Sequence, residues 1–180
     1  MTDELSDELI SRNEELLDEH KVAEALETAE EVLELNKDDA IALYLYGRSL
    51  YMDEDFEEAL VYLSKAAELE REQKDIWQVI GYCLIALGRY DEAIEPLEYV
   101  VSVDPENVEA LYTLGIVYLI TGKKSYDELI SKAFRLSKRR AVRLADQVYT
   151  KYISTSNSVD AHTKSVIERI LSRIKMPEQI

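Results

Sequence analysis

The residue types that carry out acid–base, nucleophilic or metal chemistry are sparse in this sequence. His20 and His162 are the only histidines, and they lie far apart along the chain. Acidic side chains are abundant and often adjacent, as at Glu14 and Glu15, but at helical spacing such pairs are typical of solvated faces. No glycine-rich phosphate loop, metal-ligand spacing or nucleophile elbow is present. The sequence therefore predicts a protein that is not an enzyme and needs no metal or cofactor.

The single cysteine, Cys83, excludes an internal disulfide and a cysteine-based zinc cluster. It lies between Tyr82 and Leu84 in a predicted helix, so we expect a small buried hydrophobic residue rather than a nucleophile. No amino-terminal apolar run resembles a signal peptide, and no apolar run reaches membrane-spanning length. We therefore expect a soluble, cytoplasmic protein.

The positions that must organise the fold recur at a fixed interval. Small residues repeat every 34 residues in two phases, at Gly47, Gly81 and Gly115 and at Ala25, Ala59 and Ala93. Between them the apolar residues fall three and four apart, which is helical spacing. Small residues are needed where two helices cross, because a larger side chain would hold the backbones apart. A period of this length predicts a solenoid of stacked helical pairs.

The third repeat is the clearest, with Trp77, Gly81, Tyr90, Ala93 and Pro105 at positions four, eight, seventeen, twenty and thirty-two. This pattern resembles the tetratricopeptide repeat (TPR) family over about residues 5–136. It departs from the family at position twenty-seven, where valine replaces the usual alanine. The resemblance implies an all-α, right-handed superhelix of stacked antiparallel helical hairpins with a carboxy-terminal capping helix pair.

Four TPR-like repeats are expected, at about 6–39, 40–73, 74–107 and 108–136. Their helices are expected at 5–18, 21–35, 39–52, 55–70, 74–87 and 90–103, then from Pro105 to about Ile120 and after Ser125. Asp104 is expected to cap the helix at Pro105. Ser125 and Glu128 are expected to form a capping box. The first repeat is weak, with Asn13 in place of the usual glycine, and its many acidic side chains suit the solvated outer face of a terminal cap.

Residues 137–180 depart from the repeat. Two amphipathic helices are expected at 138–153 and 158–175, joined by a polar linker at 154–157, with a disordered tail from Met176. We interpret them as a divergent fifth hairpin in a capping role. Whether they cap the solenoid or fill its groove stays open from the sequence.

Charge is unevenly distributed. Residues 1–122 hold 31 acidic and 8 basic side chains, whereas residues 123–180 hold 6 acidic and 13 basic ones. The acidic part should repel nucleic acid. The basic cluster, which comprises Lys132, Arg135, Lys138, Arg139, Arg140 and Arg143, is interpreted as a solvated face that complements the acidic repeats. A site for an acidic partner or a weak nucleic-acid patch is the alternative.

The TPR resemblance also implies which residues face a ligand. The family's groove positions fall here on a strip rich in tyrosine, a residue common in binding hot spots. The predicted protein-binding groove comprises Tyr44, Arg48, Tyr51, Gln78, Tyr82 and Tyr112. The alternative is that carboxy-terminal helices cover these rings.

One TPR subclass grips chaperone carboxylates with lysine and asparagine at set positions. Those positions here hold Ile10, Glu14, Leu45, Asp75 and Val79, so no carboxylate clamp is expected. The acidic surroundings favour an apolar or basic peptide or protein segment as partner. We therefore expect a non-catalytic protein-interaction scaffold. A self-associating structural protein that uses its apolar carboxy-terminal helices, or a regulatory subunit of a larger complex, is the alternative, and the sequence leaves the partner, pathway, organism and oligomeric state open.

Overall fold

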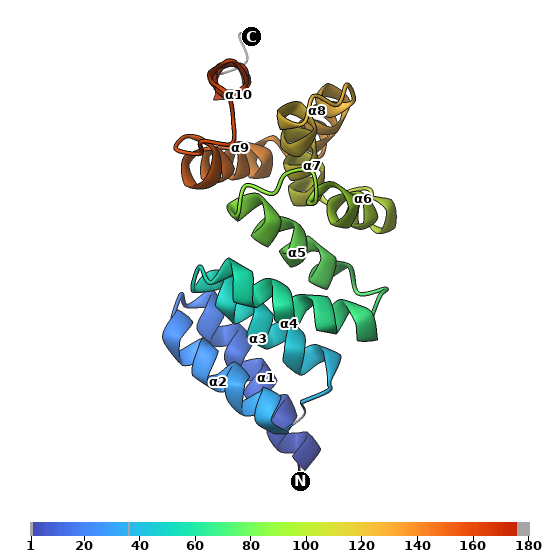
Figure 1. Cartoon of the computed structure of the whole chain (residues 1–180), viewed down its shortest axis with the longest axis vertical. Coiled ribbons are helices and arrows are strands. Elements are labelled where there is room, and N and C mark those ends of the chain that lie inside the picture. Colours follow the sequence, from blue (N-terminus) through green and yellow to red (C-terminus); the bar gives the residue numbers. More distant parts are fainter. Residues whose placement is uncertain (1, 36, 176–180) are drawn as a thin grey trace. The chain divides into compact units, whose positions relative to one another are not determined.

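The structure, a computed structural model, describes residues 2–35 and 37–175, and the tail predicted from Met176 lies outside them. Within these ranges the regular elements are all helices (Figure 1). They are α1 (Thr2–Asp18), α2 (Val22–Leu35), α3 (Ala40–Met52), α4 (Phe56–Leu69), α5 (Lys74–Ala86), α6 (Ile94–Val103), α7 (Val108–Ile120), α8 (Tyr126–Leu136), α9 (Lys138–Val148), a π-helical turn η1 (Tyr149–Ile153) and α10 (Ala161–Lys175). They form two compact units, Met1–Cys83 and Leu84–Ile180.

In the first unit, neighbouring helices pack as the repeat requires. Contacts join α1 to α2 and α3, and α3 to α2 and α4. The crossing of α3 and α4 depends on Gly47, because an added Cβ there would lie 2.7 Å from Leu63 Cγ and 3.3 Å from the carbonyl oxygen of Ala59. Leu63 is fully buried. The glycine at position eight is therefore a packing requirement, as the sequence predicts.

We expect Gly47→Ala to destabilise the first unit despite the better helix propensity of alanine. Overpacking lowers the free energy of unfolding by about 1–3 kcal/mol, and the higher helix propensity of alanine offsets about 1 kcal/mol of this loss. Chemical denaturation followed by circular dichroism measures the difference. In a double-mutant cycle with Leu63→Ala the cost of Gly47→Ala should shrink, because the clashing side chain is gone. An undiminished cost in that background would contradict the packing explanation.

The second unit repeats this crossing in α7 and α8. A Cβ on Gly115 would lie 2.6 Å from Ile130 Cγ1. The turn that precedes α6 contains Gly88, whose φ of +71° is the left-handed conformation that glycine adopts freely. The sequence predicts a turn between the helices expected at 74–87 and 90–103, and the structure confirms it.

The carboxy-terminal segment packs back onto the second unit. Helix α9 contacts both α7 and α8, and α10 contacts α9 and α7. The Tyr90 hydroxyl donates to Ser156 Oγ at 3.3 Å, which ties residues after η1 to the turn before α6. Lys164 Nζ donates to the carbonyl oxygens of Ser154 and Ser156 at 3.1 and 2.6 Å. The predicted polar linker is thus held by hydrogen bonds to its neighbours.

Three predicted helix starts and two predicted caps are wrong. Helix α10 begins at Ala161 rather than at residue 158. Helix α6 begins at Ile94 rather than at Tyr90. Helix α7 begins at Val108, where the Asn107 side chain accepts from the backbone N–H of Ala110 at 2.9 Å. Asp104 instead ends α6, because its backbone N–H donates to the carbonyl oxygen of Val100. The Ser125 side chain makes no capping hydrogen bond. Several neighbouring polar residues can cap one helix, so residue types alone do not locate these ends.

Candidate protein-binding groove

A groove of about 600 Å³ lies in the first unit between α1, α3 and α5. We call it the α3–α5 groove. Its side chains come from helical positions three, four and seven apart, which place them on one face of each helix. On α3 these are Tyr44, Arg48 and Tyr51, and on α5 they are Asp75, Gln78 and Tyr82. The groove is thus built from one face each of two neighbouring helices, with Ile10 and Glu14 of α1 at its border.

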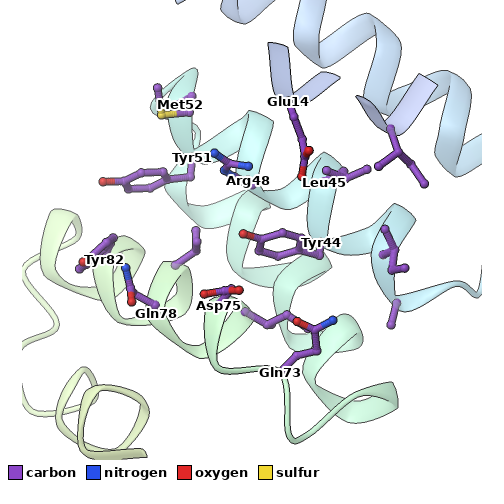
Figure 2. Close-up of a pocket in the computed structure, with 15 residues that line it drawn as sticks. Glu14, Tyr44, Leu45, Arg48, Tyr51, Met52, Gln73, Asp75, Gln78 and Tyr82 are labelled. Atoms are coloured by element: carbon purple, nitrogen blue, oxygen red, sulfur yellow. The ribbon is translucent and has the colours of Figure 1, made fainter. Parts of the chain in front are cut away.

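Charged and aromatic side chains share the middle of the α3–α5 groove. Figure 2 shows Tyr44 and Arg48 of α3 projecting between Glu14 of α1 and Asp75 of α5. Burial raises the pKa of Tyr44 above its ordinary value; Arg48 opposes this rise, and Asp75 and Glu14 add to it. The Tyr44 hydroxyl therefore stays protonated at neutral pH and can donate a hydrogen bond to a ligand carbonyl.

One end of the groove is aromatic. The rings of Tyr51 and Tyr82 lie 6.2 Å apart between centroids and are inclined by 36°. Tyr51 also contacts Phe56, with ring centroids 5.8 Å apart. At the other end Ile41 leaves 46% of its surface exposed. The α3–α5 groove therefore offers apolar and aromatic area together with one arginine and two carboxylates.

The residues predicted from the repeat are brought together, with one exception. Tyr44, Arg48, Tyr51, Gln78 and Tyr82 all line the α3–α5 groove. Met52 and Gln73 also line it, although the repeat pattern does not single them out.

The exception is Tyr112, which lies in the second unit and is 1% exposed. Its ring packs edge-on against Phe134 of α8, with centroids 6.2 Å apart. Asp146 of α9 adds to the rise in pKa that burial imposes on Tyr112. One turn away, Glu109 Oε1 pairs with Arg140 Nε at 2.5 Å. Helix α9 therefore occupies this face of α7, and Tyr112 offers no open ring to a partner.

The five clamp positions all line the α3–α5 groove, where they present two carboxylates and no lysine or asparagine. An acidic chain terminus would therefore meet like charge at these positions.

Among the described residues no group of histidine, cysteine, aspartate and glutamate could hold a metal ion. Burial raises the pKa of the Cys83 thiol to about 12, so the thiol stays neutral as predicted. None of the described helices is both long and apolar enough to cross a bilayer.

The basic cluster lies at the end of α8 and along the start of α9, where Lys132 is half-buried and its five other members are exposed. Arg140 pairs with Glu109 of α7, so part of the positive charge of the basic cluster is balanced within the second unit. This ion pair agrees with the interpretation of a solvated face that complements acidic residues of the repeats.

Known proteins and family models with helical repeats are similar to this chain. The family model described as anaphase-promoting complex, cyclosome, subunit 3 matches residues 18–100, and a TPR repeat model matches residues 81–122. Tetratricopeptide repeat-containing protein trd-1 of Caenorhabditis elegans is 34% identical over 100 residues, which are 55% of this chain and 13% of that protein. BBSome complex member BBS4 of Bos taurus is 31% identical over 122 residues, 67% of this chain and 23% of that protein. The matched regions thus span less than a quarter of either relative.

Solved structures show the same fold. A MamA structure from Desulfovibrio magneticus RS-1 is 19% identical, with a TM-score of 0.68 over 98% of both chains. The predicted fold class, an all-α solenoid of stacked helical hairpins, is thereby confirmed. The 34-residue period, the helical hairpins and the sequence matches agree, and the chain belongs to the tetratricopeptide repeat family.

Proposed function

We propose that the chain is a non-catalytic scaffold that holds an apolar or basic polypeptide segment in the α3–α5 groove. TPR repeats generally mediate protein–protein interaction, and the groove supplies a surface suited to it. The main supporting observation is that Tyr44, Tyr51 and Tyr82 border one groove with Arg48 at its centre. Aromatic and arginine side chains dominate binding hot spots because they bury large areas and donate hydrogen bonds together.

The charge of the first unit argues for the chemistry of the partner. Residues 1–83 contain 24 acidic and 7 basic side chains. A segment with lysine or arginine flanking apolar residues gains attraction as it approaches, whereas an acidic segment is repelled. The helices that position the groove are packed before a ligand arrives, so the partner bears most of the cost of ordering.

The test begins with a random peptide library displayed on phage and panned against the full chain. Enriched peptides should be apolar or basic and poor in aspartate and glutamate. Predominantly acidic enriched peptides would contradict the proposed ligand chemistry. A synthetic copy of the most enriched peptide then serves as the probe for fluorescence anisotropy.

We expect Tyr44→Ala and Arg48→Ala each to weaken binding of that peptide about tenfold, or about 1.4 kcal/mol, as hot-spot truncations do. Arg71→Ala is the matched control, because it removes the same charge from an exposed position that does not line the groove. Its affinity should stay within about twofold of the unmodified chain. Equal affinities for Tyr44→Ala and the unmodified chain would place the ligand elsewhere.

A subunit role within a larger assembly is the second candidate. Two matched descriptions name assembly components, a subunit of the anaphase-promoting complex and a BBSome complex member. Self-association through the carboxy-terminal helices has less support, because Ile167 and Leu171 of α10 are buried within the second unit. Light scattering of the full chain separates these alternatives, since a monomer excludes self-association.

A further inference from the structure

Helix α3 borders a second pocket, which opens on another side of the first unit. Tyr44 lines the α3–α5 groove and Tyr46 lines this pocket. Residues two apart on a helix point about 200° apart, so the two surfaces use nearly opposite faces of α3. The pocket encloses about 500 Å³ between α2, α3 and α4. We call it the α2–α4 pocket.

Two tyrosines form the aromatic part of the α2–α4 pocket. The rings of Tyr46 and Tyr62 lie 4.7 Å apart between centroids at 78°, an edge-to-face arrangement. Lys65 Nζ lies 5.3 Å from the centroid of the Tyr62 ring. The chain itself thus places a cation on this ring, and Lys65 is an exposed side chain that can move aside.

The border of the α2–α4 pocket is acidic with an apolar strip. Glu30, Glu34, Asp38 and Glu68 line it, against the two cations Lys37 and Lys65. Leu69 lines it as well and leaves 53% of its surface exposed. Burial, Tyr62 and the carboxylates of Glu30, Glu58 and Asp55 all raise the pKa of Tyr46, which agrees with a negative potential there.

We propose that the α2–α4 pocket is a second binding site, which receives an arginine side chain from a basic polypeptide segment. A planar guanidinium group can stack on the Tyr62 ring in place of Lys65 while it donates to Glu34 or Glu68. Its aliphatic stem and a neighbouring apolar side chain would cover Leu69. Arginine fits better than lysine, because one planar group satisfies both the ring and a carboxylate. The site acts independently of the α3–α5 groove.

The test follows backbone amide and tyrosine ring resonances of the ¹⁵N-labelled full chain by NMR. The probe is a short acetylated and amidated peptide of arginine, leucine and alanine, and its comparison peptide has citrulline in place of arginine. We expect saturable shifts around Tyr46 and Tyr62 with the arginine peptide and an affinity about fivefold or more lower with the uncharged citrulline peptide. The same shifts should persist in Tyr44→Ala, which separates this site from the α3–α5 groove. Equal affinities for the two peptides, or shifts confined to the α3–α5 groove, would overturn the proposal.

Paired charge variants sharpen the result. Glu34→Gln with Glu68→Gln should weaken the arginine peptide about fivefold, since both carboxylates line the pocket. Glu27→Gln with Glu57→Gln is the matched control, because it removes the same charge from exposed positions of α2 and α4 outside the pocket. Equal weakening by both pairs would show only a general charge effect and overturn the site. Pocket resonances that shift when the protein alone is diluted would identify a second copy as the occupant and would also overturn it.

Discussion

Tyr112→Ala is expected to destabilise the second unit by about 3–5 kcal/mol, the cost typical of deleting a buried aromatic ring. Tyr112 is 1% exposed and packs edge-on against Phe134 of α8. The substitution would leave a cavity between α7, α8 and α9, and the edge-to-face contact would be lost as well. Denaturant unfolding followed by circular dichroism measures the total change. Amide hydrogen exchange in α7 and α8 assigns that change to the second unit.

Tyr44→Ala is the matched control for this prediction. Tyr44 and Tyr112 occupy the same position of the repeat, two repeats apart. Tyr44, however, is only partly buried and lines the α3–α5 groove. Its loss should cost about 1 kcal/mol, because the site borders solvent and can relax. If the free energy of unfolding of Tyr112→Ala lies within about 1 kcal/mol of that of the unmodified chain, the packing described for α7 is contradicted.

The contrast between these tyrosines shows what the repeat can predict. Position within the repeat fixes the direction in which a side chain leaves its helix, and the groove positions of α3 and α5 do meet in one groove. Exposure depends on what packs over that face. On α7 the covering element is α9, with its Glu109–Arg140 ion pair and Asp146 near Tyr112. This element comes from the part of the chain that does not repeat, so periodicity cannot predict the burial of Tyr112.

Close helix crossings were predictable for a different reason. A contact that admits no Cβ constrains the sequence directly, so glycine stands in register at the α3–α4 crossing (Gly47) and at the α7–α8 crossing (Gly115). Helix ends carry a weaker constraint, because several neighbouring polar residues can cap the same turn. Asn107 rather than Asp104 caps α7 for that reason. The α2–α4 pocket could not be predicted, because its tyrosines come from two helices whose relative rotation only the structure supplies.

Asn13 occupies the glycine position of the first hairpin and replaces a close crossing with hydrogen bonds. Its side chain is fully buried. Asn13 Nδ2 donates to the carbonyl oxygen of Ala25 at 2.6 Å and to Ser49 Oγ at 3.1 Å. One amide thus links α1 to α2 and to α3. The buried Nδ2 group specifies how these helices sit against each other, since an alternative packing would leave it unsatisfied. The buried Oδ1 has no hydrogen-bond partner among the described residues.

Asn13→Ala should therefore destabilise the first unit by about 2–4 kcal/mol, from two lost buried hydrogen bonds and a residual cavity. Ser49→Ala is the control, because it removes one partner while the shorter bond to Ala25 remains, and it should cost about 1 kcal/mol. Denaturant unfolding of both variants and of the double variant measures the coupling between the two side chains. The double variant should lose less than the sum of the single losses, because their shared hydrogen bond is counted twice in that sum. If Asn13→Ala lowers the free energy of unfolding no more than Ser49→Ala does, the hydrogen bond to Ala25 contributes little. Apolar packing would then hold the first hairpin together.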